Sequence, residues 1–96
     1  MAGNITHGMN VEQVKQLAQQ LTQKSTQIDG ILTEVTKALE ATSWVGPDAD
    51  TFKGKWTNEG IRQLTEAKQI LADASQAASR NATTQDTTSQ AASGNF

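Results

Sequence analysis

The residues of this sequence that could do chemistry are few and lie far apart. Its single histidine, His7, has no neighbouring carboxylate or second imidazole, so it predicts neither a metal site nor general-base catalysis. Asp48 and Asp50 could be imagined as an acid and a base, but they follow Pro47, where a helix would begin. Carboxylates stabilise the positive end of a helix, and we therefore expect these aspartates to support a helix start.

The composition excludes several other classes of function. The chain has no cysteine and no glycine-rich phosphate loop, so we predict no enzyme activity, no catalytic or metal-ligating residues and no cofactor. Eight basic and ten acidic residues give a formal charge of -2 without a run of one sign, which argues against nucleic-acid binding. No apolar run approaches the roughly 18 residues of a membrane span, so we expect no stable membrane insertion. What remains is binding to other proteins.

Residues 10–42 predict a first helix, because apolar side chains recur there every three or four positions, the spacing of one helix face. Asn10 is a suitable N-cap, and Gln13 follows three residues later as in a capping box. The apolar pattern weakens within residues 24–30, which include a glycine, so a softer segment is possible there.

Residues 47–82 predict a second helix at the same spacing. Pro47 fits the first helical position, where its missing N–H costs nothing. Phe52 and Trp56 are one turn apart and are expected in the core. Gly60 continues this line, and a glycine there suggests close approach by a facing helix, although chance placement explains it nearly as well.

Only residues 43–46 separate the two helices, and so short a connection makes long neighbouring helices antiparallel. The predicted fold class is therefore all-α, a helix-turn-helix hairpin. Residues 1–9 are expected to be a flexible N-terminus. Residues 83–96 are polar and lack branched aliphatic side chains, so they are expected to form a disordered tail.

The apolar stripe on the first helix is broader than one neighbouring helix requires, which favours contact with more than one neighbour. Pairing of two hairpins into a four-helix bundle would supply those neighbours. A marginal monomer with an incompletely covered stripe is the alternative. The residues expected in the dimer interface and core are Val14, Leu17, Leu21, Ile28, Ile31, Leu32, Val35, Leu39, Phe52, Trp56, Leu64 and Leu71.

The predicted turn carries a W-x-G tripeptide, Trp44 to Gly46, midway along a chain of 96 residues and followed by Phe52 and Trp56. This arrangement resembles the WXG family, the early secreted antigenic target family of bacterial type VII secretion substrates, over essentially the whole chain. The resemblance implies a hairpin that forms a homodimer or a heterodimer with another W-x-G protein. It also implies export by a membrane machine driven by an FtsK/SpoIIIE-type ATPase.

In that family, recognition combines the W-x-G turn with a tyrosine followed four residues later by an acidic residue, and sometimes with a hydrophobic C-terminus that docks on the ATPase. Here Trp44 and Gly46 match the turn, and Phe96 could match the docking terminus. The chain has no tyrosine. Either a partner supplies that motif, or the terminus replaces it, or this chain is not itself a primary substrate.

Trp44 and Phe96 each have a structural or incidental interpretation as well as a functional one. Trp44 can pack across the open end of a bundle, and the same side chain beside Gly46 can present a surface to a receptor. Phe96 can be a docking aromatic on a polar tail or simply a terminal residue.

The resemblance and the composition together lead to one expected function and one alternative. We expect a small substrate or co-secreted partner of a type VII secretion system, cytoplasmic before export and secreted without a conventional signal peptide. The first residues lack a basic segment followed by an apolar one. The alternative is a cytosolic helical adaptor or chaperone that masks the helices of a larger partner, with the W-x-G turn serving only as a cap.

Overall fold

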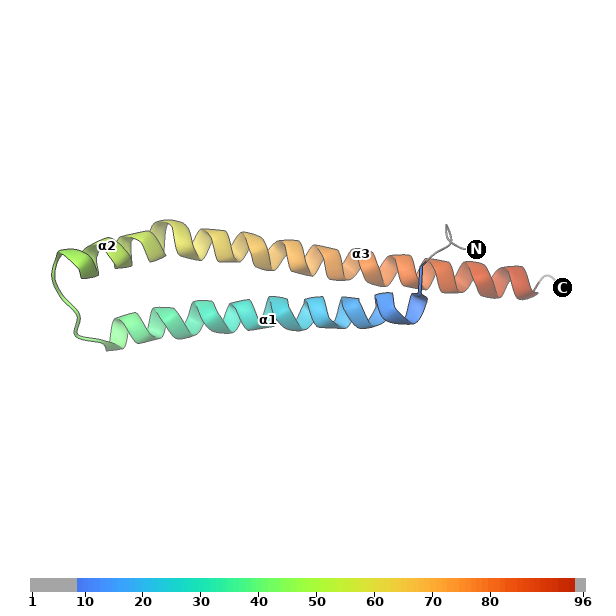
Figure 1. Ribbon diagram of the computed structural model, residues 1–96, viewed down its shortest axis with the longest axis horizontal. Coiled ribbons are helices and arrows are strands. Elements are labelled where there is room, and N and C mark those ends of the chain that lie inside the picture. The colour runs from blue at the N-terminus through green and yellow to red at the C-terminus, as the bar shows by residue number, and fades with distance from the viewer. Residues whose placement is uncertain (1–8, 95–96) are drawn as a thin grey trace. The chain divides into compact units, whose positions relative to one another are not determined.

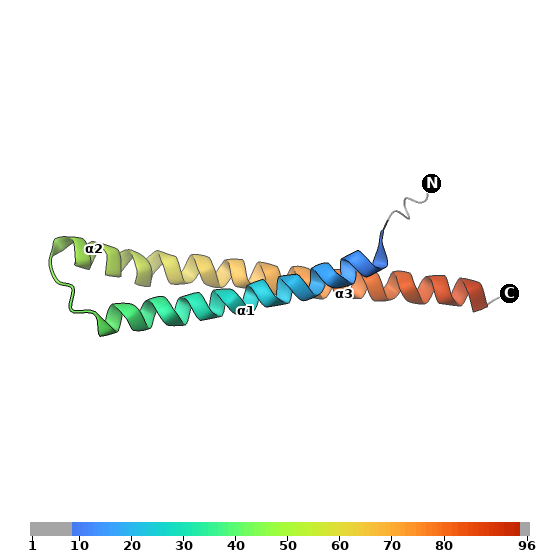
Figure 2. The ribbon, with the colours of Figure 1, turned by 60° about the horizontal axis from the view of Figure 1, so that its bottom comes forward.

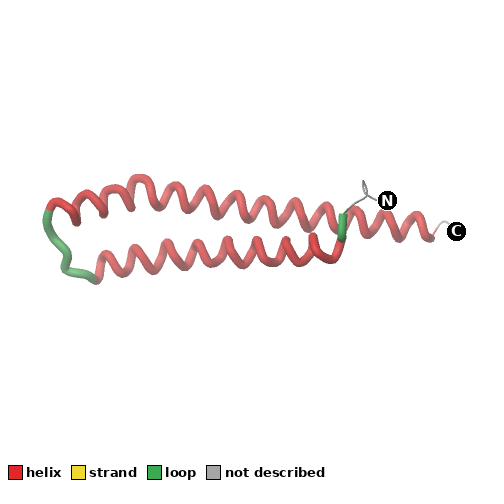
Figure 3. The backbone as a smooth tube through the Cα atoms, in the orientation of Figure 1, coloured by secondary structure: helices red, strands yellow, loops and turns green. Residues whose placement is uncertain are grey.

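The computed structural model describes the backbone of residues 9–94 and the side chains of residues 9–85. The chain forms α1 (Val11–Ala41), α2 (Pro47–Lys55), the π-helical turn η1 (Trp56–Gly60) and α3 (Ile61–Gly94). A single loop connects α1 to α2 (Figure 3). The fold is an all-α hairpin of two helices packed antiparallel, as the short connection predicts. His7, Phe96 and residues 1–8 of the predicted flexible N-terminus lie outside the described residues.

The hairpin divides into two compact units. One unit, Gln23–Leu71, contains the second part of α1, the turn, α2, η1 and the start of α3; we call it the turn unit. The other contains the described residues before Gln23 and after Leu71, and we call it the end unit. Within each unit the α1 segment lies beside the α3 segment (Figure 1), and the turned view shows the end unit's α1 segment in front of α3 (Figure 2).

The start of α1 confirms the N-cap expected from the sequence. The side-chain Oδ1 of Asn10 accepts a hydrogen bond from the Gln13 amide at 3.0 Å, and the Asn10 carbonyl accepts one from the Val14 amide. These bonds satisfy donors that the first turn of a helix leaves unpaired. The helix then continues through residues 24–30 without interruption, because one glycine costs too little to break a long helix packed along its side.

Replacing Asn10 with alanine should remove the first of these bonds. We expect a loss of about 1 kcal/mol in the free energy of unfolding, measured by urea denaturation at fixed protein concentration. Serine at the same position keeps an oxygen acceptor and should recover most of the loss. Equal stability of the alanine variant and the unchanged chain would contradict a contribution from the cap.

The second predicted helix begins as expected, at Pro47, with Asp48 and Asp50 in its first turn. It differs from the prediction in two respects. The π-helical turn η1 interrupts it, and its last segment, α3, continues to Gly94 where we predicted a disordered tail from residue 83. Once a helix is nucleated, each added residue gains a backbone hydrogen bond, and residues 83–93 contain neither glycine nor proline to stop it.

Only small side chains are buried among those described. They are Ala18, Ala49, Ser75 and Ala82, whereas no large side chain is fully buried. Ala82, with an exposed fraction of 0%, belongs to the end unit and is the last residue of the helix that we predicted. The expected core of large apolar residues is therefore absent from the single chain, and their place in a dimer interface stays a prediction.

Candidate interaction site

Hydrogen bonds from small side chains join the two helices of the hairpin. In the end unit the Ser75 hydroxyl donates to the Ala18 carbonyl at 2.7 Å and lies 2.7 Å from Thr22 Oγ1. In the turn unit the Ser25 hydroxyl donates to the Lys68 carbonyl at 3.2 Å. We call this line of contacts the polar seam, and we include in it the ion pair and the tryptophan bond described next.

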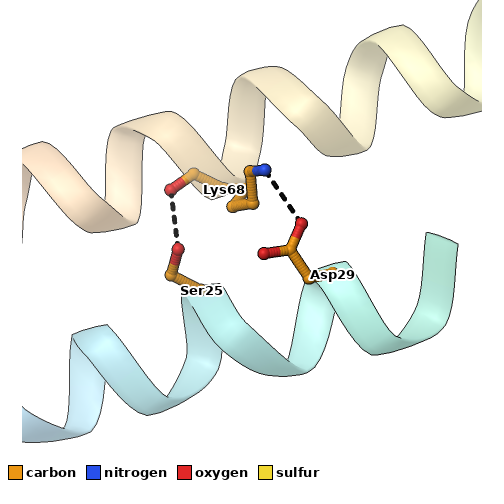
Figure 4. A network of polar contacts seen from close by, with 3 residues as sticks. All are labelled: Ser25, Asp29 and Lys68. Carbon is orange, nitrogen blue, oxygen red and sulfur yellow. Dashed lines mark hydrogen bonds and ion pairs between the residues drawn. The ribbon is translucent and has the colours of Figure 1, made fainter. Parts of the chain in front are cut away.

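Figure 4 shows the part of the turn unit farthest from the turn, where Ser25 and Asp29 of α1 both point toward Lys68 of α3. The Lys68 ammonium lies 2.8 Å from an Asp29 carboxylate oxygen. The Asp29 side chain is 59% exposed, so this ion pair contributes little to stability, but it has a defined geometry across the helices. Further along α1, Thr36 Oγ1 accepts a hydrogen bond from Trp56 Nε1 at 3.1 Å.

The large apolar residues of α1 lie beside the polar seam rather than in it. Leu21, Ile28 and Val35 each come one position before a seam residue, and one position along an α-helix is a rotation of about 100°. We call this line, with Leu17 and Ile31 at its edge, the apolar stripe. Leu17 is 46% exposed and Ile31 45% exposed, and the other three are partly exposed.

This arrangement explains why the stripe is broader than one helix contact needs. The α1 residues that bond to the neighbouring helix within the chain have small or polar side chains, and small side chains let two helices approach closely. The branched aliphatic residues are left partly exposed. Burial of a Leu or Ile gives roughly 1.5–3 kcal/mol, so a partner that covered the exposed half of one would add about 1 kcal/mol.

The turn forms a second feature, which we call the tip and define by Trp44, Val45, Gly46 and Phe52. The Trp44 and Phe52 rings pack with their centroids 6.0 Å apart and their planes inclined by 42°. The Lys53 ammonium donates to the Trp44 carbonyl at 2.9 Å. Trp44 nevertheless stays 39% exposed and Val45 86% exposed. Trp44 thus packs on the neighbouring helix turn and leaves an apolar surface in contact with solvent.

Gly46 has the only positive φ in the part of the chain that the structure describes, with φ 117° and ψ 174°. It is the N-cap of α2, and its carbonyl accepts the Asp50 amide at 3.0 Å. A Cβ at Gly46 would meet nothing within 4 Å, so backbone conformation and not lack of space requires glycine here.

Phe52 and Trp56, expected in the core, have different surroundings in the single chain. Phe52 is 43% exposed at the tip, whereas Trp56 is partly buried against Gly60 and Thr36. The neighbour that requires a glycine at position 60 is Trp56 itself, four residues earlier, and not the facing helix suggested by the sequence. The bond between Trp56 and Thr36 was missed because no local pattern links residues twenty positions apart.

The described residues contain neither a cluster of metal-ligating side chains nor a helix that could span a membrane. No group of three or more His, Cys, Asp or Glu side chains among them could hold a metal ion. No helix in that part of the chain combines the length and the apolar character needed to cross a bilayer.

The structure thus defines a helical hairpin with an incompletely covered apolar stripe and an apolar tip. Comparison of the chain with protein-family models, with curated proteins and with solved structures gives no match. The likeness to the WXG family therefore rests on the turn residues and their place in the hairpin.

Proposed function

We propose that this protein acts by binding, through pairing of its apolar stripe with a second helical hairpin, as a substrate or co-secreted partner of a type VII secretion system. The observation that supports this pairing is which side chains are buried in the single chain and which stay exposed. Every buried side chain in the described part is small, while the leucine, isoleucine and valine residues of the stripe stay partly exposed. Covering them would remove apolar surface from water, which favours association.

The secretion part of the proposal draws on the tip. Trp44 and Gly46 are the two residues that resemble the family's recognition turn, and each has a definite role in shaping the tip. Gly46 turns the backbone into α2, and Trp44 packs on Phe52 while keeping an exposed edge. The tip thus places exposed apolar side chains together at the turn, and such surfaces can bind a receptor.

The pairing is tested by the mass of the purified chain in solution, measured by light scattering over a concentration series with far-UV circular dichroism alongside. We expect a helical dimer for the unchanged chain. Ile31→Glu places a charge in the stripe and should weaken the dimer at least about tenfold, since an unpaired charge in an apolar contact is strongly unfavourable. Thr33→Glu is the matched control, because Thr33 is also exposed and lies two positions away, on the other side of α1.

Each outcome of this measurement is informative. A poorly helical monomer would show that the partner is a different hairpin, and the products of neighbouring genes should then be mixed with the chain to restore helicity. A monomer that is fully helical at every concentration, with equal behaviour of both variants, would contradict pairing through the stripe.

The secretion part needs a separate experiment in the producing bacterium. We expect the chain in the culture medium when the FtsK/SpoIIIE-type ATPase is present and only inside the cell when it is deleted. Deletion of residues 83–96 tests the proposed docking by Phe96. Export that continues without the ATPase would contradict the proposal. Unchanged export of the shortened chain would show that the tail, and with it Phe96, is not needed for recognition.

A further inference from the structure

Trp56 is held from two sides at the junction of α2 and η1. Its indole Nε1 donates to Thr36 Oγ1 on α1 at 3.1 Å. On the other side the ring lies against Gly60, where an added Cβ would be 2.7 Å from Cε3 and 3.2 Å from Cζ3 of the indole. The first of these distances is shorter than carbon atoms tolerate, so any larger residue at position 60 must displace the ring.

The π-helical turn places Trp56 and Gly60 at its two ends. The Ile61 amide donates to the Trp56 carbonyl five residues earlier, which is the bond that defines a π-turn. Such a turn holds one extra residue, so α2 is rotated by about 100° relative to α3 compared with a continuous α-helix. The orientation of α2 therefore depends on the conformation of this turn.

Packing alone does not fix the Trp56 indole. Its side chain is only partly buried, and it borders an open hollow in the turn unit lined by Thr36, Leu39, Glu40, Lys53, Trp56 and Thr57. The hydrogen bond to Thr36 and the absence of a side chain at Gly60 are the specific features that favour the observed position.

From these contacts we infer that Thr36, Trp56 and Gly60 form a latch that sets the orientation of α2 and so positions the aromatic pair at the tip. Few residues separate Trp56 from the aromatic pair at the tip. Phe52 lies one helical turn before Trp56, its ring packs on Trp44, and the adjacent Lys53 binds the Trp44 carbonyl at 2.9 Å. Thr36, Trp56 and Gly60 are positioning residues in this scheme, and the importance of the tip itself rests on the function proposed above.

The latch is tested by NMR spectroscopy of the full chain, which has two tryptophans and hence two indole N–H signals, from Trp44 and Trp56. Thr36→Val keeps the shape of the side chain and removes the acceptor, whereas Thr36→Ser keeps the hydroxyl. In the valine variant we expect solvent exchange of the Trp56 indole N–H to accelerate about fivefold, as for loss of one ordinary hydrogen bond. We also expect the ring-to-ring contacts between Trp44 and Phe52 to weaken. In the serine variant, both the exchange rate of the Trp56 indole N–H and the contacts between the Trp44 and Phe52 rings should stay unchanged.

A glycine pair tests the other side of the latch. Gly60→Ala should shift the Trp56 indole signal and weaken the contacts between Trp44 and Phe52. Gly54→Ala is the matched control, because Gly54 also lies in a helix and a Cβ there meets nothing within 4 Å. Circular dichroism confirms that each variant remains helical before its spectra are compared.

Two results would overturn the latch. One is an unchanged contact between Trp44 and Phe52 when the Trp56 indole has been released, since the tip would then be positioned without it. The other is an unchanged Trp56 signal in both Thr36→Val and Gly60→Ala. These measurements use the chain alone, so failure of export or pairing would leave the latch intact, and failure of the latch would leave export and pairing untouched.

Discussion

Replacing Gly46 with alanine is expected to destabilise the hairpin by about 1–3 kcal/mol, because the φ of 117° with extended ψ belongs to a region that residues with a side chain rarely adopt. Three requirements meet at this residue. It caps α2, it precedes Pro47, whose ring restricts the residue before it to extended ψ, and it redirects the chain out of the turn. Alanine would have to bear the strain or move the start of α2.

The control for this prediction is Gly30→Ala. Gly30 lies inside α1 with open space around its Cα, so alanine should stabilise the helix there by up to about 1 kcal/mol. Replacing glycine with alanine is therefore expected to lower the free energy of unfolding at position 46 and to raise it at position 30. The free energies of unfolding are measured by urea denaturation at one protein concentration, since association would otherwise alter them. A Gly46→Ala variant as stable as Gly30→Ala would show that the turn relaxes without cost.

Replacing Ser75 with leucine is expected to destabilise the end unit by about 1–3 kcal/mol, the usual cost of forcing a larger side chain into a close contact. Ser75 is only 7% exposed, and its hydroxyl lies 2.7 Å both from the Ala18 carbonyl and from Thr22 Oγ1. A leucine at this position would push α1 and α3 apart locally and remove both contacts.

Two further variants separate size from polarity at this position. Ser75→Ala keeps the small volume and loses only the hydroxyl, so its cost should stay near or below 1 kcal/mol. Ser79→Leu introduces the same side chain one turn later at an exposed position and should be nearly neutral. If Ser75→Leu were as stable as Ser79→Leu, the helices would not be in close contact at the seam.

The parts of the fold that follow from local rules were predicted from the sequence. Asn10 caps α1 and Pro47 opens α2 as expected, because capping and the restricted φ of proline act within a few residues. The antiparallel arrangement followed from the length of the turn. These features do not depend on which helix faces meet.

The features that the sequence did not predict depend on contacts between distant residues. The apolar periodicity located a stripe, but it did not show that Ser25 and Ser75 would form the contact within the chain while Ile28 and Val35 stayed partly exposed. The π-turn likewise begins at Trp56, whose indole bonds to Thr36 in another helix, twenty positions earlier. Extension of α3 reflects helix propagation, which outweighed a composition typical of disorder.

The separation of the polar seam from the apolar stripe also bears on how such a protein can diverge. Residues such as Ile28 and Asp29 are neighbours in sequence, yet one lies on the stripe and the other binds Lys68 within the chain. A substitution on the stripe changes the surface offered to a partner without replacing a side chain that bonds across the helices. The stripe can therefore change its side chains, and with them its choice of partner, while the seam keeps the same pairing of helices.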